Sequence, residues 1–145
     1  DSAVLKGTDG RKMSKSYNNT ISLFLAEKPL RKAINKIRTN LLEPGVPKDP
    51  DDSSVFQLWA AFASVEETAR MRNEFQAGIA WGEAKKQLFE LINSGLADAR
   101  DNYMRLMDDP GHIEAVLFQG AERARHYSGE MICKVREAVG IGAIR

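Results

Sequence analysis

The amino-acid sequence predicts a mainly α-helical protein, with a C-terminal helical bundle that follows a loop-rich N-terminal segment. Two observations support this prediction. After residue 53, apolar residues recur at intervals of three and four, the spacing that places them on one face of a helix. In the same region no period-two alternation, which would indicate a strand, reaches a useful length. The 145 residues suffice for one domain with a hydrophobic core.

The N-terminal segment combines a loop with one short helix. Residues 1–24 have the composition of a loop with short extended pieces. A helix is expected over 28–38, because Leu30, Ile34 and Ile37 then share one face. Its other positions are rich in Lys and Arg. They are typical either of an ordinary solvated helix face or of a positive wall beside an anion.

A stretch rich in Pro, Gly and Asp separates this segment from the rest of the chain. It covers residues 41–53, and its prolines and glycine exclude a helix or a central strand. We therefore predict three parts: the end of a larger domain over 1–40, a linker over 41–53, and a helical domain over 54–145.

Four helices are expected after the linker, and the first two have clear capping signals. Ser53 or Ser54 is placed to cap the first helix. Ser64 and Glu67 form a capping box for the second, in which the serine accepts from free N–H groups and the glutamate reaches back. The side chains expected in the core of these two helices are those of Val55, Leu58, Trp59, Phe62, Ala69 and Phe75.

The last two helices are longer. The third begins near Gly82, and Gly95 inside it is a weak point at which a kink or break is expected. Asp109 and Pro110 begin the fourth, as cap and first helical residue, and Gly140 and Gly142 end it. The apolar stripe of the third comprises Ala84, Leu88, Leu91, Ile92, Ala99, Tyr103 and Leu106. That of the fourth, whose small residues suggest close packing against another helix, comprises Ile113, Leu117, Gly120, Ala121, Ala124, Ser128, Met131, Val135 and Ala138.

Composition excludes several functional classes. With 43% hydrophobic residues, 28% charged residues and a net charge of +1, the protein reads as globular, and any affinity for RNA must come from local basic patches. The single cysteine, Cys133, excludes an internal disulfide and a multi-cysteine zinc site, as expected in a reducing cytoplasm. No apolar run has the length of a membrane span. No His, Asp or Glu residues have the spacing of a recognised metal site, so we predict none.

The stretch that carries chemistry is a basic loop. Lys12, Ser14, Lys15 and Ser16 follow a Gly-containing turn, and ammonium groups, hydroxyls and free backbone N–H groups are what a loop needs to hold a polyphosphate. Met13 between them can pack beneath the loop. A Walker A loop is disfavoured, because its glycine spacing does not occur. From chemistry alone, a solvated basic turn is an equal alternative.

These residues carry a resemblance. Residues 12–16 read Lys-Met-Ser-Lys-Ser, the KMSKS signature of class I aminoacyl-tRNA synthetases. The flanks on both sides are similar to those of the tryptophanyl-tRNA synthetase family. Four later stretches also resemble the C-terminal part of that family, so the resemblance covers essentially the whole chain. They are residues 81–86, 103–110, 120–125 and 135–140.

The resemblance implies roles for the loop. In this family a Rossmann-type catalytic domain, absent from these residues, binds tryptophan and ATP, and the KMSKS loop closes over the triphosphate. Lys12 and Lys15 would then be catalytic, with Lys15 the stronger candidate for transition-state charge. Met13, Ser14 and Ser16 would complete the ATP site. The implied reaction forms tryptophanyl-adenylate from tryptophan and ATP with Mg²⁺ and then charges tRNA.

The resemblance also implies partners. The helical domain would contact the anticodon of tRNA(Trp), the protein would be cytoplasmic, and the family is homodimeric although this chain alone is expected to be monomeric. Because Trp81 opens a predicted helix beside basic residues, its exposed end is a candidate RNA contact. The candidate tRNA-contacting residues are Trp81, Lys85, Lys86, Arg100 and Arg105.

Two limits and two alternatives complete the prediction. The family's second signature, of the HIGH type, and its amino-acid pocket are absent, so this chain alone is expected to be inactive. The first alternative is a fragment of another class I synthetase of the tyrosyl type, distinguished by the amino acid that the full-length protein activates. The second is a non-catalytic helical RNA-binding module, distinguished by whether a nucleotide-binding fold is encoded upstream.

Overall fold

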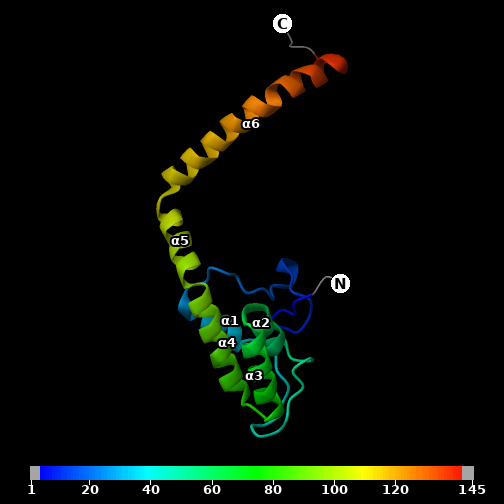
Figure 1. The fold of residues 1–145 in the computed structure, drawn as a ribbon, viewed down its shortest axis with the longest axis vertical. Coiled ribbons are helices and arrows are strands. Elements are labelled where there is room, and N and C mark those ends of the chain that lie inside the picture. Colours follow the sequence, from blue (N-terminus) through cyan, green and yellow to red (C-terminus); the bar gives the residue numbers. More distant parts are fainter. Residues whose placement is uncertain (1–3, 142–145) are drawn as a thin grey trace. The chain divides into compact units, whose positions relative to one another are not determined.

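Helices make up most of the structure, a computed structural model that describes residues 4–141 (Figure 1). The part described contains six α-helices, one short 3-10 helix and no strand, so the mainly α-helical prediction is confirmed. The chain divides into two compact units, Asp1–Asp101 and Asn102–Arg145. The helices are α1 (Glu27–Asn35), α2 (Ser54–Phe62), α3 (Val65–Gln76), α4 (Trp81–Gly95), α5 (Ala97–Asp108) and α6 (Pro110–Ala138), with the 3-10 helix η1 over Lys15–Tyr17.

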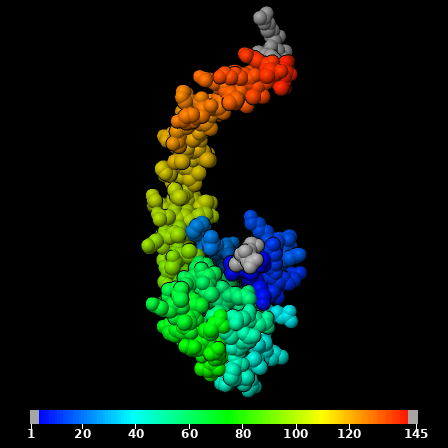
Figure 2. All heavy atoms as spheres, turned by 45° about the vertical axis from the view of Figure 1, so that its right-hand side comes forward, coloured from blue at the N-terminus to red at the C-terminus, as the bar shows by residue number. Residues whose placement is uncertain are grey.

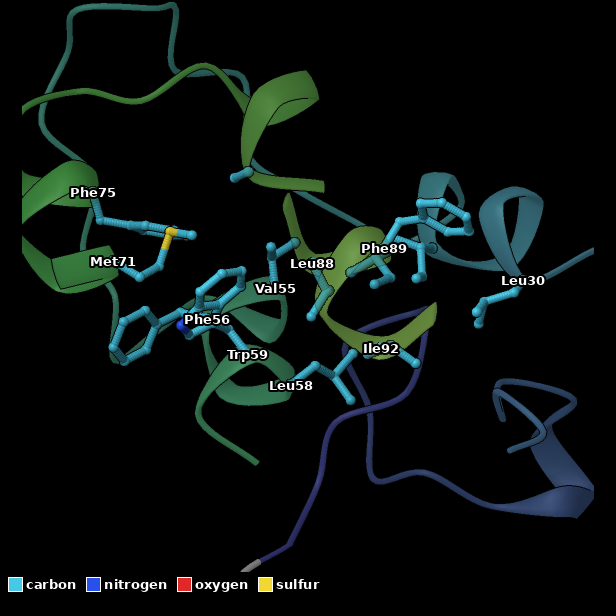
Figure 3. Packing of buried hydrophobic residues seen from close by; sticks show 13 residues of the cluster. Leu30, Val55, Phe56, Leu58, Trp59, Met71, Phe75, Leu88, Phe89 and Ile92 are labelled. Atoms are coloured by element: carbon cyan, nitrogen blue, oxygen red, sulfur yellow. The ribbon is translucent and has the colours of Figure 1, made fainter. Parts of the chain in front are cut away.

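Helices α1 to α4 form the core of the first unit. Helix α4 packs against both α1 and α2, and α2 packs against α3. The rings of Phe56 and Phe75 meet edge to face, with centroids 5.5 Å apart. Figure 3 shows the buried hydrophobic side chains of this core, which come from all four helices. The buried cluster consists of Leu30, Ile34, Ile37, Val55, Phe56, Leu58, Trp59, Met71, Phe75, Ala84, Leu88, Phe89 and Ile92.

The capping residues predicted for α2 and α3 are confirmed. The Ser53 hydroxyl accepts from the Phe56 backbone N–H at 3.3 Å. Ser64 and Glu67 form the complete capping box, with the serine N–H donating to the glutamate at 2.8 Å and the glutamate N–H donating to the serine at 3.2 Å. Two orphan N–H groups at the start of α3 are thereby satisfied, which stabilises this helix end.

The stretch over 41–53 has no helix or strand, as expected, but it is packed into the first unit. Lys48 is 2% exposed, and its ammonium donates to the carbonyls of Glu43 and Val46 at 2.9 and 3.0 Å. The Gly45 N–H donates to the Gly78 carbonyl at 2.8 Å. The boundary between the two compact units lies after residue 101. Its composition prevents regular hydrogen bonding but does not prevent packing.

The predicted third helix is two helices. Helix α4 ends at Gly95, the predicted weak point, and α5 begins at Ala97. Several predicted core positions are wrong, because the apolar stripe continues beyond the elements that cover it. Ala69, Ala99, Tyr103 and Leu106 are exposed, and Phe62 is 39% exposed.

The second unit contains the end of α5 and the long α6. The Asp109 carboxylate accepts from the His112 N–H at 3.1 Å and Pro110 is the first helical residue, so the predicted start of α6 is confirmed. Gly140 follows the helix end with a φ of +74°, while Gly142 lies outside the described residues. No residue of α6 is buried among residues 4–141, so the expected close-packed partner helix is not found there. The packed bundle is made by α1 to α4 instead. None of the helices described is both long and apolar enough to cross a membrane.

Candidate functional site

The basic loop predicted from the sequence is a turn closed by backbone hydrogen bonds. Lys6 and Lys12 face each other in an isolated antiparallel bridge. On either side of it, the Gly7 N–H donates to the Arg11 carbonyl at 2.7 Å and the Met13 N–H donates to the Leu5 carbonyl at 2.9 Å. Figure 2 shows this N-terminal part of the chain, in blue, at the surface of the first unit. From this base the turn exposes Lys12, Lys15, Ser16 and Tyr17.

A buried amide lies inside the turn. Asn19 is 1% exposed, and its Oδ1 accepts from the Ser14 N–H at 2.8 Å. Its Nδ2 donates to the Asp9 carboxylate at 2.7 Å and to the Lys12 carbonyl at 3.1 Å. One side chain thus satisfies two backbone groups of the loop and one charged group beside it.

Asp9 connects this amide to the outer surface of the loop. Its carboxylate pairs with the guanidinium of Arg11 at 2.7 Å, and that guanidinium lies 4.3 Å from the ring centre of Tyr17. The hydrogen bond from Asn19, assisted by Arg11, lowers the pKa of Asp9 from 3.8 to about 2. The carboxylate is therefore ionised at any physiological pH and remains an acceptor only.

The two lysines of the signature are free to bind an anion. Lys12 and Lys15 are exposed, and neither ammonium has an ion-pair or hydrogen-bond partner among residues 4–141. The hydroxyls of Ser14 and Ser16 lie 2.9 Å apart beside them. Two cations, two hydroxyls and exposed backbone N–H groups suit the oxygens of a polyphosphate.

Met13 packs beneath the loop, as expected. It is partly buried against the hydrophobic core of the first unit. It also lines an apolar pocket of about 90 Å³ with Leu5, Ile21, Leu30 and Ile92 among its walls. A flexible apolar side chain between the two lysines therefore anchors the loop while both ammonium groups face solvent.

Two of the predicted tRNA-contacting residues are engaged inside the first unit. Trp81 is half-buried, its ring meets Phe75 edge to face, and its N–H donates to Asn40 at 3.1 Å. The ammonium of Lys85 donates to the carbonyls of Asn35 and Ile37 at 3.0 and 2.7 Å, which caps the C-terminal end of α1. Burial lowers the pKa of Lys85. Both residues have packing roles in this structure.

The other three candidates differ in exposure and partners. Lys86 is exposed on α4, and its ammonium has no ion-pair or hydrogen-bond partner among residues 4–141, so its charge is available at the surface of the first unit. Arg100 is half-buried and lies 3.4 Å from the Leu25 carbonyl, a long hydrogen bond. Arg105 belongs to the second unit, where it donates to Asn102 at 3.2 Å. Of the four candidates in the first unit, Lys86 alone is exposed in the described part of the chain.

Sequence reasoning missed Asp9 and Asn19 as parts of the loop. It took both only as flanks of the signature, because nothing in their spacing shows that they meet across a turn. An available signal was Asn19 itself, a polar residue two positions before the more apolar stretch 21–25.

The described residues do not form a metal centre. No group of three or more His, Cys, Asp or Glu side chains is placed to hold an ion within residues 4–141. The donors of the loop are ammonium, hydroxyl and N–H groups, which suit phosphate oxygens, whereas Mg²⁺ takes oxygen ligands. The donors of residues 12–16 thus suit phosphate oxygens.

Comparisons with known proteins show what this chain is similar to. A scan against models of protein families finds no match. The chain is 49% identical over 143 residues to the tryptophan–tRNA ligase of Pseudomonas aeruginosa, a match that covers 99% of this chain and 32% of that protein. It is 49% identical over 142 residues to the tryptophan–tRNA ligase of Neisseria meningitidis, covering 98% of this chain and 42% of the relative.

Solved structures agree with these relatives. The crystal structure of tryptophanyl-tRNA synthetase from Campylobacter jejuni complexed with ADP and tryptophan matches with a TM-score of 0.90 and 36% identity. That match covers 95% of this chain and 44% of the Campylobacter chain. A second structure of the same enzyme matches with a TM-score of 0.87 and 35% identity. The chain therefore spans between about a third and less than half of the proteins that it matches.

Proposed function

We propose a function from one premise: over a partial segment, this chain belongs to the tryptophan–tRNA ligase family. Its basic loop binds the phosphates of ATP while the full-length protein forms tryptophanyl-adenylate. The observation that carries the proposal is the pair of exposed ammonium groups of Lys12 and Lys15, which have no partner within residues 4–141, on a loop whose backbone is held by a buried amide.

The two lysines act on charge that develops during the reaction. In adenylate formation the tryptophan carboxylate attacks the α-phosphoryl group, the bond between the α-phosphorus and the bridging oxygen breaks, and pyrophosphate leaves with the bonding electrons. Positive groups that are already aimed at the leaving phosphates lower the free energy of this transition state. Lys15 is the stronger candidate for this role, and Lys12 binds the phosphates beside it.

The remaining loop groups position the triphosphate. The hydroxyls of Ser14 and Ser16 can donate to phosphate oxygens, as can the backbone N–H groups of Lys15 and Ser16. Closure of such a loop orders the site and excludes water. When bound, Mg²⁺ neutralises phosphate charge. The residues described here contact the phosphates and do not form the metal cage.

The test is adenylate formation by the full-length protein, measured as tryptophan-dependent pyrophosphate exchange. We expect Lys15→Ala to lower kcat by about 10²-fold, the usual loss when one charge-stabilising donor is removed. Lys12→Ala should have a smaller effect and raise the KM for ATP. Lys134→Ala, an exposed lysine of α6, is the matched control. Unchanged kcat in Lys15→Ala would contradict the proposal, and exchange activity of the isolated chain would contradict its expected inactivity.

The helical part contributes to tRNA binding in this proposal. Lys85 and Lys86 are adjacent, yet Lys85 caps α1 and Lys86 faces solvent, so the pair separates packing from binding. Lys86→Ala should weaken binding of tRNA(Trp) and reduce its salt dependence, because one phosphate contact is lost. Lys85→Ala should instead lower the thermal stability of the first unit. Unchanged tRNA binding in Lys86→Ala would show that Lys86 does not contact the tRNA.

Amino-acid specificity and anticodon recognition need separate measurements. A titration with tRNA(Trp) and with the same tRNA carrying a swapped anticodon, at one moderate salt concentration, tests whether the helical part reads the anticodon. Equal weak binding of both would leave only charge, and would assign the specificity to the rest of the full-length protein or to another amino acid. The homodimer of the family stays a prediction for the full-length protein, to be checked by sedimentation.

A further inference from the structure

We propose that Asn19 is the positioning residue of the phosphate loop and sets the backbone geometry from which Lys12 and Lys15 reach the nucleotide. This inference rests on the proposed function and adds a residue outside the signature to it. The geometry points to Asn19 because one buried side chain holds backbone groups on both sides of Met13.

The hydrogen bonds of Asn19 act on the two ends of a three-residue segment. Its Oδ1 accepts from the Ser14 N–H at 2.8 Å, and its Nδ2 donates to the Lys12 carbonyl at 3.1 Å. These bonds restrict the backbone torsions between the first lysine and the serine that precedes Lys15. The long lysine side chains stay mobile, while the backbone between Lys12 and Ser14 is held at both ends.

A second contact determines which way the amide points. The Asp9 carboxylate accepts from Nδ2 at 2.7 Å, and an ionised carboxylate only accepts. The nitrogen must therefore face Asp9, so the oxygen is left to face the Ser14 N–H. Arg11 holds Asp9 in turn, through its Nε at 2.7 Å. The depressed pKa of Asp9 agrees with this network and keeps the carboxylate charged in neutral solution.

The backbone at Gly7 approaches Asn19 closely. A Cβ atom on Gly7 would lie 2.4 Å from Cγ of Asn19, closer than real Cβ atoms approach other heavy atoms. The Asn19 carbonyl also accepts from the Thr8 N–H at 3.0 Å. Asn19 is thus enclosed by the turn that it stabilises, and the requirement for glycine at position 7 follows from it.

The expected consequence is on catalysis more than on binding. Without the amide, the loop keeps its two ammonium groups, so attraction for ATP largely remains. It loses the fixed placement of those groups relative to the leaving phosphates, and a displacement of about 1 Å can lower a rate by about 10²-fold. Substitution of Asn19 should therefore lower kcat and leave the KM for tryptophan unchanged.

The experiment compares variants of the full-length protein in tryptophan-dependent pyrophosphate exchange. Asn19→Asp keeps an acceptor for Ser14 but sets a second carboxylate against Asp9, and we expect kcat to fall at least tenfold. Adding Asp9→Asn to Asn19→Asp exchanges the amide and the carboxylate and restores their mutual hydrogen bond. The double variant should recover several-fold of the lost kcat. Asn73→Asp, the same change at an exposed position of α3, should keep kcat within twofold of the parent protein.

A general loss of stability would not explain a recovery of kcat when Asp9→Asn is added to Asn19→Asp. If Asn19→Asp is folded at the assay temperature and keeps the parental kcat while Lys15→Ala loses it, the positioning role is overturned and the proposed function stands. If Lys15→Ala also keeps its kcat, the proposed function itself fails. If Asn19→Asp does not fold, amide hydrogen exchange of the unmodified protein decides. The Ser14 N–H should exchange much more slowly than the Lys15 and Ser16 N–H groups, and equal rates would overturn the proposal.

Discussion

The two units of this chain have the same secondary structure and opposite packing. Residues 4–101 fold around thirteen buried hydrophobic side chains drawn from the first four helices and the turn after α1. In α6, a helix of 29 residues in the second unit, apolar side chains such as Leu117 and Met131 are exposed, at 66% and 63%. Both regions satisfy the local rules for helices, including a capped start.

The difference shows that helical periodicity specifies a face but not its partner. The stripe of α4 meets α1 and α2, so Leu88 has no exposure. The stripe of α6 has an equally regular spacing and meets no described residue that buries it. Burial of apolar area stabilises a fold by about 25 cal/mol per Å², so the first unit has a source of stability that α6 by itself lacks.

The largest expected effect comes from truncating one leucine in each unit. Leu88→Ala should destabilise the protein by about 2–5 kcal/mol, through lost burial and the cavity left behind. Leu117→Ala should cost roughly 0.5 kcal/mol or less, as is usual for exposed positions. Urea unfolding monitored by circular dichroism measures both. Similar costs at the two positions would show that the apolar face of α6 is buried in solution, and would remove the contrast.

A glycine in each unit gives effects of opposite sign. Gly78 has a φ of +87°, and an added Cβ would lie 2.4 Å from the Gly45 backbone, so Gly78→Ala should destabilise by about 2–4 kcal/mol. Gly129 lies within α6 in open space, and Gly129→Ala should stabilise that helix by roughly 0.5–1 kcal/mol. Gly45 also has a positive φ, but an added Cβ there meets no atom, so Gly45→Ala measures the cost of the backbone torsion without the clash. Thermal melts of the three variants give the comparison, and a neutral Gly78→Ala would contradict the close approach.

Removing a serine hydroxyl from each unit should give a smaller difference in stability between the two units. Ser64 closes the capping box of α3, and Ser64→Ala should cost about 1 kcal/mol. Ser128 bonds back to the Ala124 carbonyl at 2.7 Å inside α6, where a hydroxyl contributes little. Ser128→Ala should therefore be close to neutral. Chemical denaturation of the two variants is the measurement, and a Ser64→Ala variant as stable as the parent protein would mean that the cap adds nothing.

The smallest effect is the acid sensitivity of the loop in the first unit. The pKa of Asp9 is lowered from 3.8 to about 2, chiefly by the hydrogen bond from Asn19. Because the folded pKa is the lower one, the stabilisation is complete above pH 3.8 and is lost as the pH falls toward 2. Carboxyl NMR titration should show a midpoint near 2 that rises in Asn19→Ala. A midpoint that stays unchanged in this variant would assign the shift to Arg11.

Local chemistry made much of the fold predictable. The capping residues Ser53, Ser64 and Asp109 act as expected, because a cap depends on residues within one turn. The break at Gly95 was predictable for the same reason. The core positions at Ala69 and Leu106 were wrong, because burial depends on which element covers a face, and that information is not in the spacing of one helix.

The candidate site divides in the same way. The lysines and serines of residues 12–16 were identified from the sequence, since their charges and hydroxyls need no partner to be recognised. The engagement of Trp81 with Phe75 and of Lys85 with the end of α1 was not predictable, because each partner is distant in sequence.

The sequence by itself determined the helices, their caps and the chemical character of the phosphate loop. These properties arise from torsional preferences, hydrogen bonds within a turn of chain, and the charges of neighbouring side chains. Only the tertiary structure decided which apolar faces are buried and which lysines stay free. It also brought Asp9, Lys12 and Ser14 to the amide of Asn19, because a turn must close before residues ten apart can share one hydrogen-bond network.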